Sequence, residues 1–188
     1  MAKGGGSTRT RGSSRTITKD DVLGSLESFG YGYDNALNEY LRNPDATHSR
    51  YGDYEITKDV KKSFENNARN IEKAFDLLPT ENHLFMWRGL AFNTKKEYDS
   101  FVKSLQKGTV TDAGFPFVST SKKEAYNYAD NGKYRAVITY EDVRSLDISK
   151  YNDGSAHEGE HILQRNVKYR VKEISSYGGR LHVKLKMM

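Results

Sequence analysis

The chain has 188 residues, a formal net charge of +5 and no cysteine. The absence of cysteine excludes disulfides, thiolate zinc sites and a cysteine nucleophile. No apolar run approaches the roughly 20 residues that a membrane-spanning helix needs, and the N-terminal residues lack the apolar segment of a secretory signal. We therefore expect a cytoplasmic protein with no membrane partner. We also expect it to be a monomer.

The N-terminal residues differ in composition from the rest. Of residues 1–18, eleven are Gly, Ser or Thr, and the charged ones are four basic residues without an acidic one. Such a segment buries too little apolar surface to offset its ordering entropy. We expect residues 1–17 to be a disordered basic tail, capable of a weak electrostatic contact with nucleic acid. Residues 18–188 are expected to form one domain. Residues 19–163 sum to −5, so the excess basic charge does not indicate a nucleic-acid-binding face.

A helical lobe is predicted over residues 18–80. Thr18, followed by Asp20 and Asp21, is typical of a helix N-terminus. Residues 34–41 predict a second short helix. Thr57 begins a longer segment that Pro79 ends, with apolar residues at three- and four-residue spacing.

A β core is predicted over residues 81–188. Short β-branched and aromatic runs bounded by Gly, Asn or Asp are typical of strands. They predict strands at 84–87, 115–120, 134–140, 160–164, 169–174 and 181–185, with helices at 94–106 and 122–129. Helices followed by strands, without regular alternation, favour an α+β fold.

The segment His157-Glu158-Gly159-Glu160-His161 fits two incompatible patterns. One is H-E-x-x-H, in which a helix presents both histidines to zinc and the glutamate activates water. Glu173 or His182 could nominally supply the third ligand. The other pattern is Glu-x-Glu on a strand, where residues two apart share one face. Gly159 in the middle disfavours the helix.

The strand pattern has companions earlier in the chain. Residues 84–88 end an apolar run with an arginine, and residues 117–121 end another with the triplet Ser119-Thr120-Ser121. The pair Glu158 and Glu160 continues into residues 162–165, Ile-Leu-Gln-Arg. This ordered set resembles the mono-ADP-ribosyltransferases of the arginine–serine–glutamate class, which include binary-toxin-like enzymes and small phage enzymes that modify host proteins. The resemblance covers about residues 83–188 and implies two packed mixed or antiparallel sheets after the helical layer.

The resemblance implies cleavage of the nicotinamide–ribose bond of NAD, without a metal, and transfer of ADP-ribose to an acceptor. Glu160 matches the catalytic glutamate, which stabilises an oxocarbenium-like ribosyl cation. Arg88 matches the arginine that anchors an NAD phosphate. Gly89 matches a position whose backbone approaches nicotinamide, where no Cβ would block the approach. Ser119 matches the serine that orients the catalytic glutamate.

The remaining expected NAD-binding residues lie close to the serine. Thr120 and Ser121 are expected to shape the same strand end, although a helix cap would equally explain such a triplet. Tyr126 and Tyr128 are candidates to stack on nicotinamide.

The expected acceptor of ADP-ribose depends on Glu158. In the resembling family, glutamate at that position accompanies transfer to arginine. The chemistry agrees, because a guanidinium is a poor nucleophile and needs a carboxylate to take its proton. A target protein presenting arginine is therefore the expected partner beside NAD, in a host cell if the chain is a phage or bacterial effector. The alternatives are an NAD glycohydrolase, ADP-ribosylation of a nucleic acid, a zinc hydrolase and an inactive NAD- or nucleic-acid-binding module.

Overall fold

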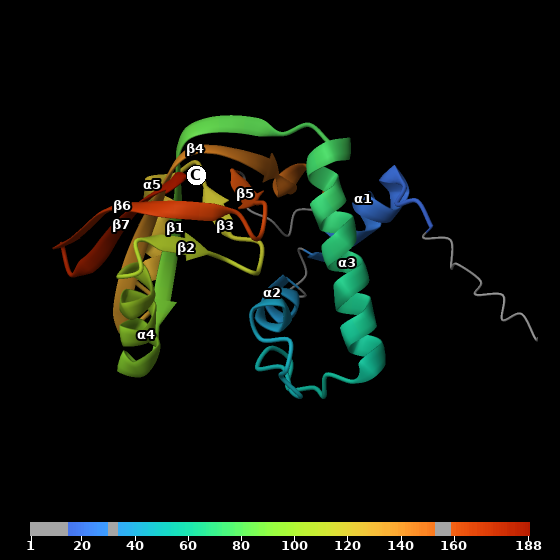
Figure 1. Ribbon diagram of the computed structural model, residues 1–188, viewed down its shortest axis with the longest axis horizontal. Helices are drawn as coiled ribbons and strands as arrows, with labels where there is room; N and C mark the ends of the chain where they lie inside the picture. The colour runs from blue at the N-terminus through green and yellow to red at the C-terminus, as the bar shows by residue number, and fades with distance from the viewer. Residues whose placement is uncertain (1–14, 30–33, 153–158) are drawn as a thin grey trace, which may run out of the picture.

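The computed structural model describes residues 15–29, 34–152 and 159–188. Most of the predicted tail therefore lies outside the described residues. Three helices, α1 (Lys19–Ser28), α2 (Asp34–Arg42) and α3 (Lys58–Leu77), stand together on one side of the strands (Figure 1). They form the predicted helical layer.

Side-chain caps fix where these helices begin. The Thr18 hydroxyl accepts from the Asp21 backbone N–H, while the Asp21 carboxylate accepts from the Thr18 backbone N–H, which makes a capping box. Thr57 accepts from the Val60 N–H and caps α3. Both predicted helix starts are confirmed.

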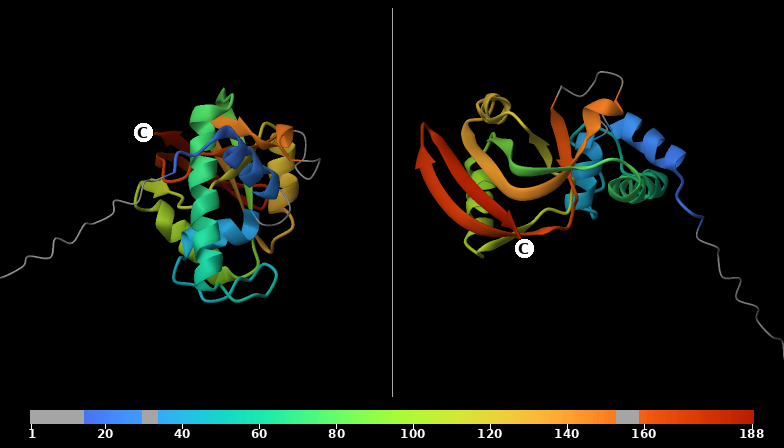
Figure 2. Two further views of the ribbon diagram at one scale, coloured as in Figure 1. Left: turned by 90° about the vertical axis from the view of Figure 1, so that its right-hand side faces the viewer. Right: turned by 90° about the horizontal axis from the view of Figure 1, so that it is seen from above.

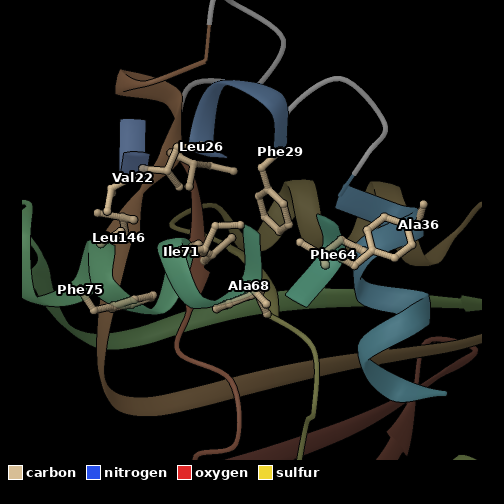
Figure 3. Close-up of a cluster of buried hydrophobic side chains, with 14 of the residues drawn as sticks. Val22, Leu26, Phe29, Ala36, Phe64, Ala68, Ile71, Phe75 and Leu146 are labelled. Carbon is tan, nitrogen blue, oxygen red and sulfur yellow. The ribbon is translucent and has the colours of Figure 1, made fainter. Parts of the chain in front are cut away.

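The helical layer is joined to the β core by one continuous cluster of buried apolar side chains (Figure 3). The Phe29 ring, directly after α1, stacks on Phe117 with ring centroids 5.3 Å apart and meets the edge of Phe115 at 5.9 Å. These contacts position the segment that carries Ser119. The labelled members of the cluster are Val22, Leu26, Phe29, Ala36, Phe64, Ala68, Ile71, Phe75 and Leu146.

Seven strands follow the helical layer. Their bounds are β1 (Glu81–Phe92), β2 (Thr109–Thr111), β3 (Phe117–Ser119), β4 (Tyr134–Asp147), β5 (Glu160–Leu163), β6 (Lys168–Tyr177) and β7 (Arg180–Met187). Between them lie α4 (Lys95–Leu105), α5 (Lys122–Ala129) and the short 3-10 helix η2 (Ile148–Lys150). The α+β class is confirmed. The short β2 and η2 were not predicted.

The strands form one hydrogen-bonded sheet in the order β1-β3-β5-β4-β7-β6-β2, with β1 also paired to β4. The expected two packed sheets are therefore two parts of one continuous mixed sheet. The reason is the 14-residue β4, which curves strongly (Figure 2, right). It pairs with β1 from Tyr134 to Ser145 and with β7 from Ala136 to Glu141, and its last three residues pair with β5. One bent strand thus connects both parts of the sheet. None of the helices in the described ranges is long and apolar enough to cross a bilayer.

Helix α5 packs directly on β1 at Gly89. A Cβ at Gly89 would overlap the Ala125 carbonyl oxygen and lie 2.9 Å from the Ala129 nitrogen. The glycine therefore has a packing role that was not expected: its missing side chain makes room for the backbone of α5.

We expect Gly89→Ala to lower the free energy of unfolding by about 3 kcal/mol, the upper end of the usual range for overpacking, because backbone must move. Urea denaturation measures this directly. Gly24→Ala is the matched control, because a Cβ at Gly24 meets nothing within 4 Å. That substitution should stabilise the protein by about 0.5–1 kcal/mol, since Gly24 lies inside α1. Equal effects at the two positions would contradict the packing explanation.

Candidate active site

Three neighbouring strands bring the predicted catalytic residues together. In the antiparallel register, Trp87 of β1 lies opposite Ser119 of β3, and Ser119 lies opposite Glu160 of β5. Directly opposed residues have Cβ atoms about 4.5–5.5 Å apart and share one face of the sheet. Arg88 directly follows Trp87. Ser119 and Glu160, 41 residues apart in sequence, are therefore direct neighbours, and Arg88 is the residue after the position of β1 that lies opposite Ser119.

The segment around Glu160 is a strand and not a helix. Gly159 has φ of +81°, and Glu160–Leu163 form β5. The zinc-helix pattern is thus wrong, because a right-handed helix cannot pass through that φ at Gly159. Glu173 and His182, considered as third ligands, lie on β6 and β7. His157 and Glu158 themselves lie outside the described residues.

A cavity of about 930 Å³ opens between the helical layer and the sheet. One wall comes from α2 and the loop after it, and the other comes from β1, β3, β5 and α5. Arg88, Gly89, Ser119 and Glu160 all line this cavity. The volume is at the upper end for a site that holds a small organic ligand or cofactor.

Arg88 is held by a carboxylate that no sequence motif had indicated. Its Nη1 donates to Asp112 Oδ2 at 3.0 Å, and its side chain is 17% exposed. The same carboxylate accepts two bonds from Arg42, from Nε at 2.8 Å and from Nη2 at 2.9 Å. Arg42 ends α2 and also lines the cavity. Asp112 therefore holds two guanidinium groups, one from each wall of the cavity, close to each other.

Their surroundings hold Asp112 and Arg88 in their ionised forms. Burial alone would raise the pKa of Asp112, but the hydrogen bonds from Arg42 and the charge of Arg88 lower it to about 2. Burial disfavours the charge on Arg88 and would lower its pKa. The electrostatic interactions and hydrogen bonds with Tyr140 and Asp112 outweigh this effect and raise the pKa of Arg88. Two cations against one anion leave a net positive charge at the cavity, which suits a phosphate.

Asn38 links α2 to the loop between β2 and β3, which carries Asp112. Its side chain accepts from the Phe115 N–H at 2.7 Å and donates to the Phe115 carbonyl at 3.2 Å. The Gly114 N–H in turn donates to Asp112 Oδ1 at 2.9 Å. A Cβ at Gly114 would come within 2.6 Å of Asn38 Oδ1. This packing holds the helical layer and the arginine pair in fixed relation.

Asn38 and Arg42 were not singled out from the sequence. The sequence did offer one signal for them. They are four residues apart, and this spacing puts two polar side chains on one face of a short amphipathic helix. Asp112 gave no comparable signal, because it lies in a loop that joins two short strands.

The three residues of the hydroxyl triplet 119–121 have different roles. Ser119 lines the cavity, and its hydroxyl accepts from the Ser121 N–H at 3.0 Å. Ser121 caps α5 by accepting from the Glu124 N–H at 3.3 Å, as the helix-cap alternative anticipated. Thr120 is exposed, and its N–H donates to the Gly159 carbonyl at 3.4 Å. It therefore connects β3 to the turn before Glu160.

The two candidate tyrosines are also separated. Tyr128 is 60% exposed and lines the cavity. Tyr126 packs on the opposite side of α5, where the Arg180 guanidinium lies 4.8 Å from its ring centroid. Of the two, only Tyr128 keeps a position suited to stacking on a ligand.

The sequence matches the model of a known protein family over residues 6–187, described as ADP-ribosyltransferase exoenzyme. The chain therefore belongs to the ADP-ribosyltransferase exoenzyme family, whose fold and candidate site agree with the mono-ADP-ribosyltransferase class. No curated protein matches the sequence.

Solved structures of similar fold come from several bacteria. The Vis toxin, an ADP-ribosyltransferase from Vibrio splendidus, aligns with 17% identity and a TM-score of 0.65, over 92% of this chain and 74% of that one. Exoenzyme S from Pseudomonas aeruginosa aligns with 15% identity and a TM-score of 0.61, over 90% and 74%. An ADP-ribosyltransferase from Clostridium botulinum aligns with 12% identity and a TM-score of 0.59, over 91% and 87%. These likenesses confirm the fold.

Proposed function

We propose that this family member uses NAD to transfer ADP-ribose to an arginine side chain of a target protein. The observation that carries the proposal is the register that sets Ser119 opposite Glu160, with Arg88 on the adjoining strand of the same cavity. A carboxylate, a hydroxyl and a guanidinium at one cavity wall are the groups that NAD cleavage requires.

Glu160 acts on the ribose in this proposal. Breaking the nicotinamide–ribose bond develops positive charge on the ribose, and a carboxylate beside that charge lowers the barrier. Ser119 positions Glu160 from the opposite strand. Tyr128 offers a ring for the nicotinamide at the cavity edge, and the Gly89 backbone contributes to the same wall.

The arginine pair holds the pyrophosphate. Arg88 presents a guanidinium already oriented by Asp112, so little side-chain entropy is lost when phosphate binds. Arg42 approaches the same cavity from α2 and shares the same carboxylate. The pyrophosphate is then held between a guanidinium from the sheet wall and one from the α2 wall.

Arginine as the acceptor rests on Glu158. Two residues before Glu160, it belongs to the Glu-x-Glu pattern that accompanies transfer to arginine in the resembling enzymes. The Vis enzyme has been crystallised in complex with agmatine, a guanidinium compound. Exoenzyme S has been crystallised with a human 14-3-3 protein and carba-NAD. These two complexes support the proposal that this chain uses a guanidinium acceptor and binds a protein partner.

Glu158→Gln tests the acceptor assignment. The change keeps size and hydrogen bonding but removes the base, so transfer to agmatine should fall by about 10²-fold or more. Slow hydrolysis of NAD should persist, because water needs less activation than a guanidinium. Nicotinamide release and ADP-ribosyl-agmatine formation are measured side by side. Equal loss of both reactions, or unchanged transfer, would refute the separate role of Glu158.

A further inference from the structure

A second cluster of chemically competent side chains lies on the opposite face of β5 from Glu160. Glu81 and His83 come from the start of β1, and His161 directly follows Glu160 on β5. Successive residues of a strand point to opposite faces, so His161 faces away from the cavity that Glu160 lines. One ligand atom from each of Glu81, His83 and His161 lies within 4.8 Å of the other two.

The two imidazoles are in edge-to-face contact. Their ring centroids are 5.1 Å apart and the rings are nearly perpendicular. His161 Nδ1 lies 2.8 Å from the buried Ser145 hydroxyl, which leaves Nε2 as the nitrogen available for an ion. A hydrogen-bond partner at the second ring nitrogen orients a ligating histidine. His83 Nε2 is buried and has no hydrogen-bond partner.

The position of Glu81 completes the set. Its Oε2 is 3.6 Å from His83 Nε2, and its side chain is 42% exposed, which gives an ion a route from solvent. Ligand atoms around a tetrahedral zinc ion lie about 3.3 Å apart, so the ligand atoms, all within 4.8 Å of one another, need to approach by at most about 1.5 Å. Side-chain rotation at the half-exposed Glu81 can shorten the distances that involve its carboxylate.

A cation already occupies part of this cluster. Lys150 of η2 places its ammonium 2.8 Å from Glu81 Oε1 and 3.1 Å from Asp147 Oδ2. Its interaction with these carboxylates shows that the cluster attracts positive charge. A bound metal ion would replace the ammonium at Glu81, while Lys150 could keep its contact with Asp147.

We propose that Glu81, His83 and His161 form a binding site for Zn²⁺ or a similar divalent transition-metal ion, with a fourth position left to water. Two imidazoles and a carboxylate are ligands that zinc prefers, whereas Mg²⁺ and Ca²⁺ prefer oxygen alone. The ion would link the start of β1 to β5, immediately behind Glu160. It takes no part in the NAD reaction and would act by fixing the strand that carries the catalytic glutamate.

Calorimetric titration of chelator-treated full-length protein with Zn²⁺ tests the site without measuring activity. We expect one tight equivalent, and a Co²⁺ titration should give the visible absorption of tetrahedral cobalt. His83→Gln and Glu81→Gln should each raise the Kd by at least about 10-fold. Both side chains are more accessible than His161, so these variants spare the buried core. His182→Gln, which alters a histidine on β7, is the matched control and should bind as wild type does.

Lys150→Met provides the sharper test. If the ammonium competes with the ion for Glu81, its removal should tighten Zn²⁺ binding by about twofold to fivefold. A merely structural role for Lys150 predicts no tightening. His157→Gln separates the site from the H-E-x-x-H pattern. Binding that survives His83→Gln but is lost in His157→Gln would overturn the proposal, as would the absence of any one-to-one binding.

Discussion

Replacing Glu160 with glutamine is expected to reduce NAD cleavage by about 10²–10³-fold, the usual loss when one preorganised electrostatic group is removed from a transition state. Glutamine keeps the shape of β5 and the pairing of residue 160 with Ser119, so only the negative charge is lost. Nicotinamide release under saturating NAD measures the change in kcat.

The effect should belong to chemistry and not to folding. Thermal unfolding of Glu160→Gln should match that of the wild-type protein within a few degrees. Glu173→Gln, on the exposed face of β6, controls for the loss of a carboxylate elsewhere and should leave kcat unchanged. A Glu160→Gln enzyme that retained most of its activity would remove Glu160 from the reaction.

Asp112→Asn is expected to destabilise the protein by about 3–5 kcal/mol, because breaking a buried ion pair leaves an uncompensated charge. The charges at risk are Arg88, which is largely buried, and Arg42 beside it. NAD should also bind more weakly, since the guanidinium groups lose the carboxylate that orients them. Urea denaturation and NAD titration measure the two effects. Asp99→Asn removes an exposed pair with Lys95 on α4 and should cost at most about 0.5 kcal/mol.

The same carboxylate predicts a pH dependence of stability. The pKa of Asp112 is lowered to about 2 from an ordinary 3.8, so its ionised form stabilises the fold above about pH 4. That contribution, roughly 2 kcal/mol, should disappear as the pH falls from 4 through 2. The difference in unfolding free energy between wild type and Asp112→Asn should shrink over the same interval. A constant difference across it would contradict the assignment of the acid-sensitive charge to Asp112.

Local patterns in the sequence predicted most elements of this fold. Thr18 and Thr57 begin helices because their hydroxyls satisfy backbone N–H groups a few residues away, and that chemistry is visible in the sequence. The strands predicted at 84–87 and 134–140 end before the observed C-terminal ends of β1 and β4. Their continuation depends on pairing with each other over eleven register positions, a tertiary contact that local composition does not encode.

In the candidate site, too, residues within local motifs were predicted and residues that depend on tertiary contacts were not. Arg88, Ser119 and Glu160 each end or begin an apolar run, so their motifs could be recognised in order along the chain. Asp112 and Arg42 could not be recognised as partners, because they are 70 residues apart and neither interrupts a periodic pattern. The packing role of Gly89 could not be predicted either, since the contact with α5 exists only after β1 and α5 have packed.

The acceptor specificity can be measured most directly on synthetic peptides. Peptides that differ only in one central residue, arginine, lysine, asparagine or cysteine, are incubated with the enzyme and NAD, and fragmentation mass spectrometry locates any ADP-ribose. The proposed function predicts modification of the arginine peptide alone, abolished in Glu160→Gln and strongly reduced in Glu158→Gln. Modification of the asparagine or cysteine peptide, or nicotinamide release with no modified peptide, would contradict transfer to arginine.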